Sequence, residues 1–100
     1  MAPALVRSYN PPMYEWDEAK RQTNLACHGV DFAEAASFEW AVAMTMTDRR
    51  RDYGEERFIS ISFMGERLHV LVWTQRGETK RLISLRKANQ REVRRYVDRT

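Results

Sequence analysis

Three arginines between positions 76 and 86 are the side chains of this sequence best suited to chemistry on an anionic group. Arg76 follows one predicted strand, and Arg81 and Arg86 lie on the next. A guanidinium group stays charged at neutral pH, and its planar fork can hold two oxygens of a phosphate. Successive strand residues point to opposite faces, which places Arg86 on one face and Arg81 with Lys87 on the other unless a bulge or twist intervenes. We therefore expect Arg76 and Arg86 beside one phosphate, with Arg81 as the alternative.

The turn Tyr53-Gly54-Glu55 is the best candidate for acid–base chemistry away from these strands. Gly54 frees the backbone, so that the Glu55 carboxylate can point into a cleft. The alternative is an ordinary turn in which Glu55 forms an ion pair with Arg57. His28 is a second candidate for proton transfer, although an imidazolium at a helix C-terminus also simply complements the helix dipole.

The composition limits the chain to one small domain with an uneven charge distribution. The 100 residues carry a formal net charge of +3 and a pI near 9.4. Basic residues concentrate in positions 76–100, whereas acidic residues dominate positions 15–39. This asymmetry favours a polyanionic partner; the alternative is a merely solvated basic face. A hydrophobic content of 43% excludes a disordered chain.

Disulfide, metal-binding and membrane-spanning signals do not appear in the sequence. The single Cys27 cannot form an intrachain disulfide, and one cysteine with two histidines matches no usual zinc spacing. The longest strongly apolar run, residues 68–73, is far too short to cross a bilayer. We therefore expect a soluble cytoplasmic protein that needs no metal and no other cofactor.

Residues 56–87 predict the three antiparallel strands around which the fold is organised. Apolar and polar residues alternate in positions 58–63, and positions 68–73 are almost continuously apolar. The segments Gly65-Glu66 and Arg76-Gly77-Glu78 are short enough to close two hairpins. These elements must position the arginines named above.

The N-terminal part predicts a leader, a short strand and two helices. All three prolines lie in residues 1–12, so we expect a flexible leader there and a single domain at residues 13–100. A strand at residues 13–16 precedes a helix that Asp17 caps and Gly29 ends. One side of this helix carries Ala19, Thr23, Ala26 and Cys27. Lys20 and Asn24, one turn apart, could reach solvent together beside the sheet, although capping and solvation are equally good interpretations.

The remaining segments complete an α+β fold. Asp31 and Glu34 form the capping box of a second, shorter helix, whose buried stripe we expect to be Phe32, Ala35 and Ala36. We predict an edge strand in residues 41–47 and a charged loop in residues 48–54. Asn89 caps a terminal helix with an apolar stripe of Val93, Tyr96 and Val97. Helices packed on one face of an antiparallel sheet are the expected architecture.

Four motifs in register resemble the BrnT family of toxins. The first runs from Trp16-Asp17 through Lys20, Asn24 and His28-Gly29-Val30 to Phe32 and Ala35. The others are Asp48-x-Arg50-x-x-Tyr53-Gly54-Glu55-x-Arg57, Thr74-x-Arg76-Gly77, and Arg81-x-Ile83-Ser84-x-Arg86-Lys87-Ala88. The resemblance covers residues 13–96 without large gaps. The sequence departs from the family pattern at Cys27, Ser62 and Leu85, and Cys27 removes one cation from the end of the first helix.

The resemblance implies a RelE-like fold and a place in a type II toxin–antitoxin system. Such toxins are metal-independent endoribonucleases that cleave RNA and inhibit translation. The implied partner is a BrnA-like, DNA-binding antitoxin, which neutralises the toxin in a hetero-oligomeric complex. The resemblance implies that the toxin reaches promoter DNA only through this complex. A competing hypothesis is a decayed toxin, a basic domain that binds RNA or protein without catalysis.

Cleavage of RNA without a metal uses the 2′-hydroxyl as nucleophile, and it therefore needs a base, cations beside the phosphate and an acid for the leaving oxygen. The expected catalytic residues are Arg76, Arg86, Glu55 and Tyr53. The expected RNA-binding residues are Arg57, Arg81, Lys87, Lys20 and His28.

Overall fold

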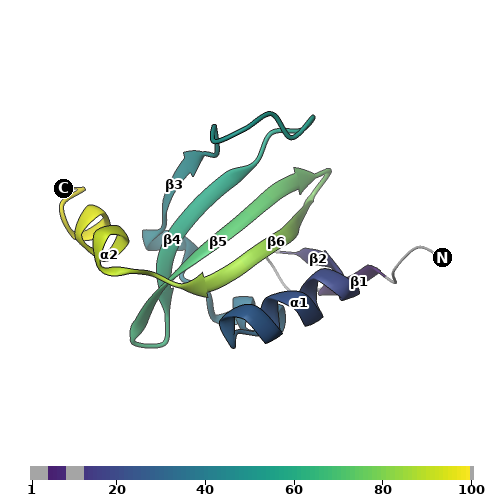
Figure 1. Ribbon diagram of the computed structural model, residues 1–100, viewed down its shortest axis with the longest axis horizontal. Helices are drawn as coiled ribbons and strands as arrows, with labels where there is room; N and C mark the ends of the chain where they lie inside the picture. The colour runs from purple at the N-terminus through teal and green to yellow at the C-terminus, as the bar shows by residue number, and fades with distance from the viewer. Residues whose placement is uncertain (1–4, 9–12, 100) are drawn as a thin grey trace.

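The computed structural model describes residues 5–8 and 13–99, which form an α+β fold around one six-stranded sheet (Figure 1). The strands lie in the order β1-β2-β6-β5-β4-β3. Their bounds are β1 (Leu5–Ser8), β2 (Tyr14–Asp17), β3 (Met44–Thr47), β4 (Phe58–Met64), β5 (Arg67–Arg76) and β6 (Thr79–Lys87). The helices are α1 (Glu18–His28), α2 (Gln90–Val97) and the 3-10 helices η1 (Phe32–Ser37) and η2 (Trp40–Val42).

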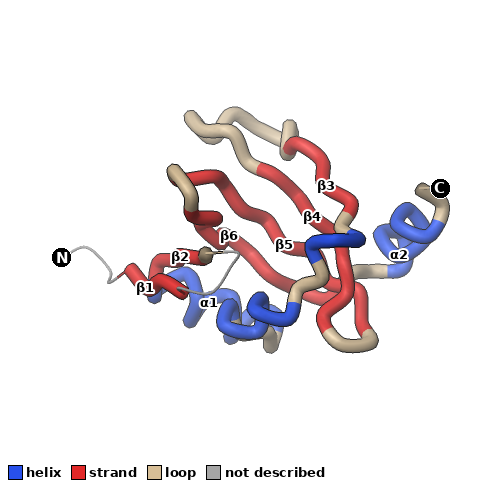
Figure 2. Tube along the Cα trace, turned by 180° about the vertical axis from the view of Figure 1, so that it is seen from behind, coloured by secondary structure: helices blue, strands red, loops and turns tan. Residues whose placement is uncertain are grey.

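The central meander β4-β5-β6 confirms the three strands predicted from the alternation of apolar and polar residues. The pairs β4–β5 and β5–β6 are both antiparallel, and glycines with positive φ lie in both turns, at Gly65 and Gly77. β3 pairs with β4 along the outer edge, which confirms the predicted edge strand for residues 44–47. Residues 40–42 form η2 instead. Figure 2 shows β3 and β4 joined by the long loop of residues 48–57.

The N-terminal strands extend the sheet beyond β6. β2 pairs with β6 in parallel, and β1 pairs with β2 in the antiparallel sense. The strand predicted at residues 13–16 is therefore confirmed, although it begins and ends one residue later. The predicted leader, residues 1–12, contains β1, while residues 1–4 and 9–12 lie outside the described part of the chain. Its flexibility and the domain boundary at residue 13 stay predictions.

A β-bulge divides β6 and changes which side chains share a face. Trp73 of β5 lies opposite Leu82, but Val72 lies opposite Ser84, so that Ile83 has no partner in the β5–β6 ladder. An extra residue reverses the alternation beyond the bulge. Leu82 and Leu85 consequently enter the same core, although they are three positions apart.

The buried side chain of Asn24 attaches α1 to the exposed edge of β6. Its amide nitrogen donates to the carbonyls of Leu85 (2.7 Å) and Val30 (3.0 Å), while its carbonyl oxygen accepts the Leu85 N–H (3.0 Å). β2 covers only residues 80–82 of β6, and the carboxamide therefore provides the hydrogen bonds that a neighbouring strand would otherwise provide.

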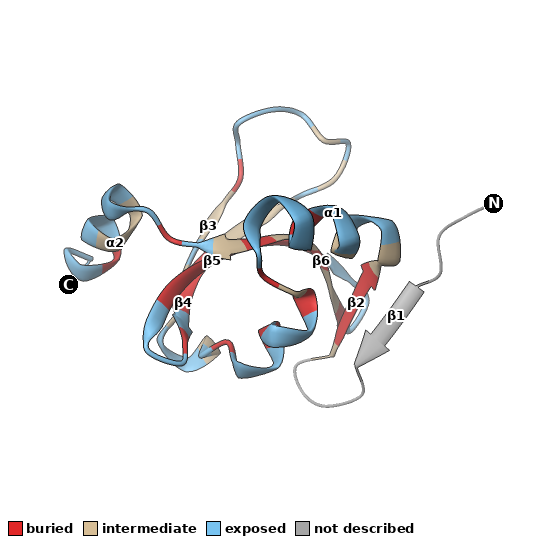
Figure 3. Cartoon of the chain, turned by 60° about the horizontal axis from the view of Figure 1, so that its bottom comes forward, coloured by how far each residue is buried: buried red, intermediate tan, exposed pale blue. Residues whose placement is uncertain are grey.

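The expectation that Asn24 reaches solvent beside Lys20 is wrong, because its carboxamide is buried against main-chain groups. The apolar side predicted for α1 is not buried either: Ala19, Thr23, Ala26 and Cys27 are all exposed. Figure 3 accordingly shows α1 coloured mostly as exposed. Polar contacts therefore contribute to its attachment, together with the caps at Asp17 and Gly29 that the sequence predicts correctly.

Two hydrophobic clusters occupy the two faces of the sheet. The larger contains Phe32 and Ala35 of η1 with Leu71, Trp73 and further residues of β2, β4 and β6. The smaller contains Val70, Ile61 and Tyr96 of α2. Because Val70 and Leu71 are consecutive strand residues, these clusters lie on opposite faces. The expectation that all helices cover one face is therefore wrong, since α2 packs on the face opposite η1.

Two helical stripes differ in detail from the sequence prediction. η1 has the predicted capping box of Asp31 and Glu34, but as a 3-10 helix it turns every three residues and leaves Ala36 exposed. In α2, Tyr96 is buried and donates to the carbonyl of Val42 (2.7 Å), whereas Val97 is 62% exposed. The end of a two-turn helix on a sheet edge cannot bury both residues.

The Asn24→Ala substitution is expected to lower the free energy of unfolding by about 3 kcal/mol, because three buried main-chain groups lose their partner. Urea unfolding followed by circular dichroism measures this change. The neighbouring Thr23→Ala substitution is the control, since Thr23 is exposed and its loss should cost less than about 0.5 kcal/mol. Equal effects of the two substitutions would contradict a role of Asn24 in attaching α1.

Candidate active site

Four of the predicted site residues lie together where the loop of residues 48–57 meets the end of β5. The two carboxylate oxygens of Glu55 accept from different arginines: Oε2 from Arg57 Nε (3.1 Å) and Oε1 from Arg76 (3.0 Å). The Arg57 guanidinium carbon lies 4.0 Å from the centre of the Tyr53 ring. We name Tyr53, Glu55, Arg57 and Arg76 the Glu55 cluster. It combines a carboxylate, two guanidinium groups and a phenol.

Local turns give the Glu55 cluster its shape. Gly54 has a φ of 71°, and its N–H donates to the Asp52 carboxylate (2.9 Å). The hydroxyl of Thr74 donates to the carbonyl of Glu56 (2.6 Å), which holds the loop against β5. A hollow opens beside the cluster and is lined by residues 54–56, Phe58 and residues 74–76. The prediction that Gly54 lets Glu55 turn toward a cleft is consistent with this geometry.

Asp48 anchors the start of the same loop. Its side chain is fully buried, and its two oxygens accept from the Arg50 guanidinium at 2.8 and 2.7 Å. Oδ1 also accepts the Arg50 N–H (3.1 Å), and the Asp48 N–H donates to the carbonyl of Arg57 (2.8 Å). The hydrogen bonds from Arg50 hold the pKa of Asp48 at about 2. The carboxylate is therefore charged at neutral pH.

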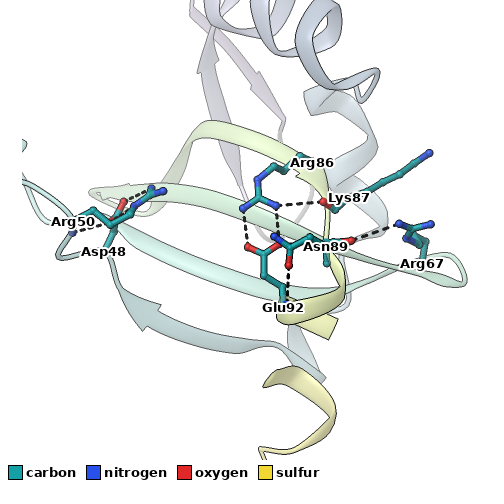
Figure 4. A network of polar contacts seen from close by, with 8 residues as sticks. Asp48, Arg50, Arg67, Arg86, Lys87, Asn89 and Glu92 are labelled. Carbon is teal, nitrogen blue, oxygen red and sulfur yellow. Dashed lines mark hydrogen bonds and ion pairs between the residues drawn. The ribbon is translucent and has the colours of Figure 1, made fainter. Parts of the chain in front are cut away.

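Arg86 forms a separate ion pair with Glu92 of α2 (Figure 4). Both guanidinium nitrogens donate to the carboxylate, each at 2.7 Å. Glu92 Oε1 also accepts the Asn89 N–H (2.9 Å) in the capping box of α2. The hydrogen bonds from Arg86 lower the pKa of Glu92, and those to Glu92 raise the pKa of Arg86. This pair links the end of β6 to α2.

The bulge places Arg81 and Arg86 on one face of the sheet, together with Arg76. Arg81 lies opposite Thr74, and Arg86 lies opposite Val70, four residues along the same strand. We call this the arginine face. The bulge allowed for in the sequence prediction is thus present, and Lys87, which lies opposite His69, points to the other face.

The expectation that Arg76 and Arg86 share one phosphate is wrong. β5 and β6 are antiparallel. Arg76, at the end of β5, therefore lies opposite Thr79 at the start of β6, whereas Arg86 lies near the end of β6. Six residues of strand separate the two positions, which corresponds to roughly 20 Å. Two arginines at that separation bind different groups of a ligand.

The other predicted RNA-binding residues lie apart from the Glu55 cluster. Arg81 forms an ion pair with the buried Glu15 (3.2 Å). Lys20 and His28 line a groove between α1 and β6, together with Ile83 and Ser84. Lys87 is exposed. The fold therefore brings together Tyr53, Glu55, Arg57 and Arg76 and leaves the remaining candidates at other positions.

Sequence reasoning did not assign site roles to Asp48, Arg50 and Glu92. The Asp48-x-Arg50 spacing could have indicated the first pair, because an aspartate often accepts the backbone N–H two residues later. The sequence predicts the cap at Asn89, but not the pairing of Glu92 with Arg86 of β6. A carboxylate that serves a helix cap and an arginine at once is visible only in the folded chain.

The Glu55 cluster contains the groups needed for acid–base chemistry on a phosphate ester. A carboxylate can accept a proton, a phenol can donate one, and two guanidinium groups can stabilise charge on phosphate oxygens. Among residues 5–8 and 13–99, no three His, Cys, Asp or Glu side chains are grouped so that they could hold a metal ion.

Comparison with protein families gives one assignment over most of the chain. Residues 16–92 match the family model described as "Ribonuclease toxin, BrnT, of type II toxin-antitoxin system". A search of curated proteins finds no match. In the described part of the chain, no helix is long and apolar enough to cross a membrane.

Asp48→Asn should lower the melting temperature at pH 7 and much less at strongly acidic pH. The pKa of Asp48 falls from an ordinary 3.8 to about 2 in the folded protein, so its stabilisation is present above pH 3.8 and is lost as the pH falls through 2. Thermal unfolding of both proteins between pH 7 and pH 2 measures the difference. Glu66→Gln, in the exposed β4–β5 turn, controls for loss of a carboxylate; a pH-independent effect of Asp48→Asn would contradict the ion pair.

Proposed function

Since this chain belongs to the BrnT family of ribonuclease toxins of type II toxin–antitoxin systems, we propose that it is a metal-independent endoribonuclease whose reaction centre is the Glu55 cluster. One observation carries this proposal: the two oxygens of Glu55 are held by two different arginines, Arg57 and Arg76. A phosphate is negatively charged, as a carboxylate is, and it likewise offers pairs of oxygens to arginine side chains. Substrate phosphate can therefore replace Glu55 as the partner of both arginines.

The exchange of partners prepares the general base. Once the arginines bind phosphate oxygens, a Glu55 oxygen is free to accept the proton of the 2′-hydroxyl. The resulting oxygen attacks the adjacent phosphorus, and the bond to the 5′-oxygen breaks. Tyr53 donates a proton to the leaving 5′-oxygen. The products are a 2′,3′-cyclic phosphate and a 5′-hydroxyl, and the proton count is balanced because one proton is taken up and one is released.

The two arginines stabilise the transition state. Charge accumulates on the phosphate oxygens as the 2′-oxygen attacks, and guanidinium groups fixed in advance interact more strongly with that charge than with the ground state. Arg57 is held by stacking on the Tyr53 ring at 4.0 Å, which supports its orientation after Glu55 departs. Arg86, roughly 20 Å away along the strands, binds a different phosphate of the substrate. Cleavage of RNA would inhibit translation.

Substitutions in the Glu55 cluster should abolish most of the cleavage. Arg76→Ala is expected to reduce the rate by about 10²-fold or more through loss of a transition-state donor. Glu55→Gln keeps the shape of the side chain but removes the base, for an expected loss of about 10²–10⁴-fold. Cleavage of a defined RNA in excess EDTA, with analysis of the product ends, measures both effects.

Arg91→Ala is the matched control, because Arg91 is an exposed arginine of α2 outside the Glu55 cluster. Folded Arg76→Ala and Glu55→Gln proteins that cleave at the parental rate would show that the reaction centre lies elsewhere. Parental activity that requires a metal would exclude the metal-independent mechanism, and products with 3′-hydroxyl ends would exclude attack by the 2′-hydroxyl. A parent protein that binds RNA without cleaving it would favour the non-catalytic alternative.

An antitoxin is the partner that the family assignment implies. We propose that a BrnA-like, DNA-binding antitoxin neutralises this chain by placing an acidic segment over the arginine face. Opposite charges accelerate association, and an occupied face excludes RNA. The toxin would then reach promoter DNA only through this hetero-oligomeric complex.

Binding of the antitoxin should slow hydrogen exchange of the amides in residues 49–56, most of which lie in exposed loop outside the strands. Hydrogen-exchange mass spectrometry of the free toxin and of the complex measures this protection. The exposed surface of α1, at the β6 edge of the sheet, is the internal reference. Protection confined to α1, together with inhibition, would show that neutralisation acts from another face.

A further inference from the structure

The loop of residues 48–57 carries three consecutive arginines that the proposed reaction does not use. Arg49 and Arg51 are exposed, and among the described residues no carboxylate lies within ion-pair distance of either. Arg50 is bound to Asp48, yet 63% of its side chain remains exposed. The loop as a whole is neutral, with four arginines and four carboxylates, but Arg49 and Arg51 present their guanidinium groups to solvent.

Arg51 lies beside the Glu55 cluster, and Arg50 lies near the Arg86–Glu92 pair. On one side, the Arg51 guanidinium carbon is 5.6 Å from the centre of the Tyr53 ring. On the other, Arg50 is close enough for its charge to contribute to lowering the pKa of Glu92, after the larger effect of Arg86. Figure 4 shows the Arg50–Asp48 and Arg86–Glu92 pairs as two separate ion pairs. Positive groups thus continue from the reaction centre to the end of β6.

The first residues of this loop are also held in place. The buried Asp48 carboxylate binds both the backbone N–H and the guanidinium of Arg50, and its own N–H is bonded to Arg57. A loop that is already ordered loses less conformational entropy when a ligand binds. A buried anchor beneath exposed cations is the arrangement expected for a ligand-binding loop, whereas simple solubility requires no anchor.

We propose that Arg49, Arg50 and Arg51, with Arg86 at the far end, form a binding track for the backbone of single-stranded RNA next to the cleaved bond. The inference rests on the proposed function and extends it: the substrate is several nucleotides long rather than one dinucleotide step. The span of roughly 20 Å between Arg76 and Arg86 accommodates several phosphates. We assign the track to single-stranded RNA, because a series of cations can follow the backbone of one strand without reading its sequence.

The double substitution Arg49→Ser/Arg51→Ser tests this track, because it leaves the Asp48–Arg50 anchor intact. For the parent, kcat/KM should be higher on a twelve-nucleotide RNA than on a dinucleotide with the same cleavable step. The double variant should lose about tenfold on the long RNA and stay within about twofold on the dinucleotide. Each phosphate contact contributes about 0.7 to the slope of log K against log salt, so two lost contacts should make the slope shallower by about 1.4.

Arg91→Ser/Arg95→Ser is the matched control, since it removes the same charge from exposed arginines of α2. Thermal unfolding verifies that all proteins are folded. Equal losses in the two double variants, or an unchanged ratio of long to short RNA in the loop variant, would overturn the track. Tighter binding of a duplex than of the single strand would overturn the assignment to single-stranded RNA.

A 2′-O-methyl RNA of twelve nucleotides separates the track from the proposed reaction, because it has no 2′-hydroxyl to attack. Its binding is followed by fluorescence anisotropy at several salt concentrations. A loop variant that binds this RNA weakly and with a shallower slope supports the track even if the parent cleaves no RNA, an outcome that would refute the proposed function alone. Parental binding and slope in the loop variant would refute the track alone.

Discussion

The pairing of β5 with β6, interrupted by one bulge, is the constraint on which the rest of this structure depends. Before the bulge, Leu82 faces Trp73 and enters the larger core; after it, Leu85 faces Leu71 and enters the same core. An uninterrupted strand would place one of these leucines on the opposite face of the sheet. The same shift puts Arg81 and Arg86 on one face, so that a core requirement and the arrangement of the cations have a single cause.

The exposed edge beyond the bulge explains why α1 is attached by an amide. β2 ends its pairing with β6 at Leu82, and the main chain near Leu85 would otherwise have unpaired groups. Asn24 binds both the N–H and the carbonyl of Leu85. An unpaired buried main-chain group costs about 1–3 kcal/mol, which outweighs the small apolar contribution that the alanines of α1 could make. α1 thus covers the sheet edge and also provides hydrogen-bond partners for its main chain.

Carboxylates on or near the arginine face keep its cations oriented and electrically balanced. Glu55 binds Arg57 and Arg76, Asp48 binds Arg50, and Glu92 binds Arg86. The pairs of Glu55 and Glu92 are partly exposed and contribute little to stability, so their main physical effect is to fix the direction of the guanidinium groups. An arginine oriented in advance loses little entropy on binding phosphate. The exposed Arg49 and Arg51 have no such ion-pair partner among the described residues.

The sequence by itself determined the local structure: the three strands of the meander, the caps at Asp17, Gly29 and Asn89, and the turn at Gly54, because these depend on neighbouring residues. It also carried the family motifs, in which Tyr53, Glu55 and Arg57 are close in the chain and remain close in the fold. Only the tertiary structure decided the face of α2, the burial of Asn24 and the separation of Arg76 from Arg86. These depend on strand register and on pairing between distant segments, and one inserted residue is enough to reverse every face assigned from alternation.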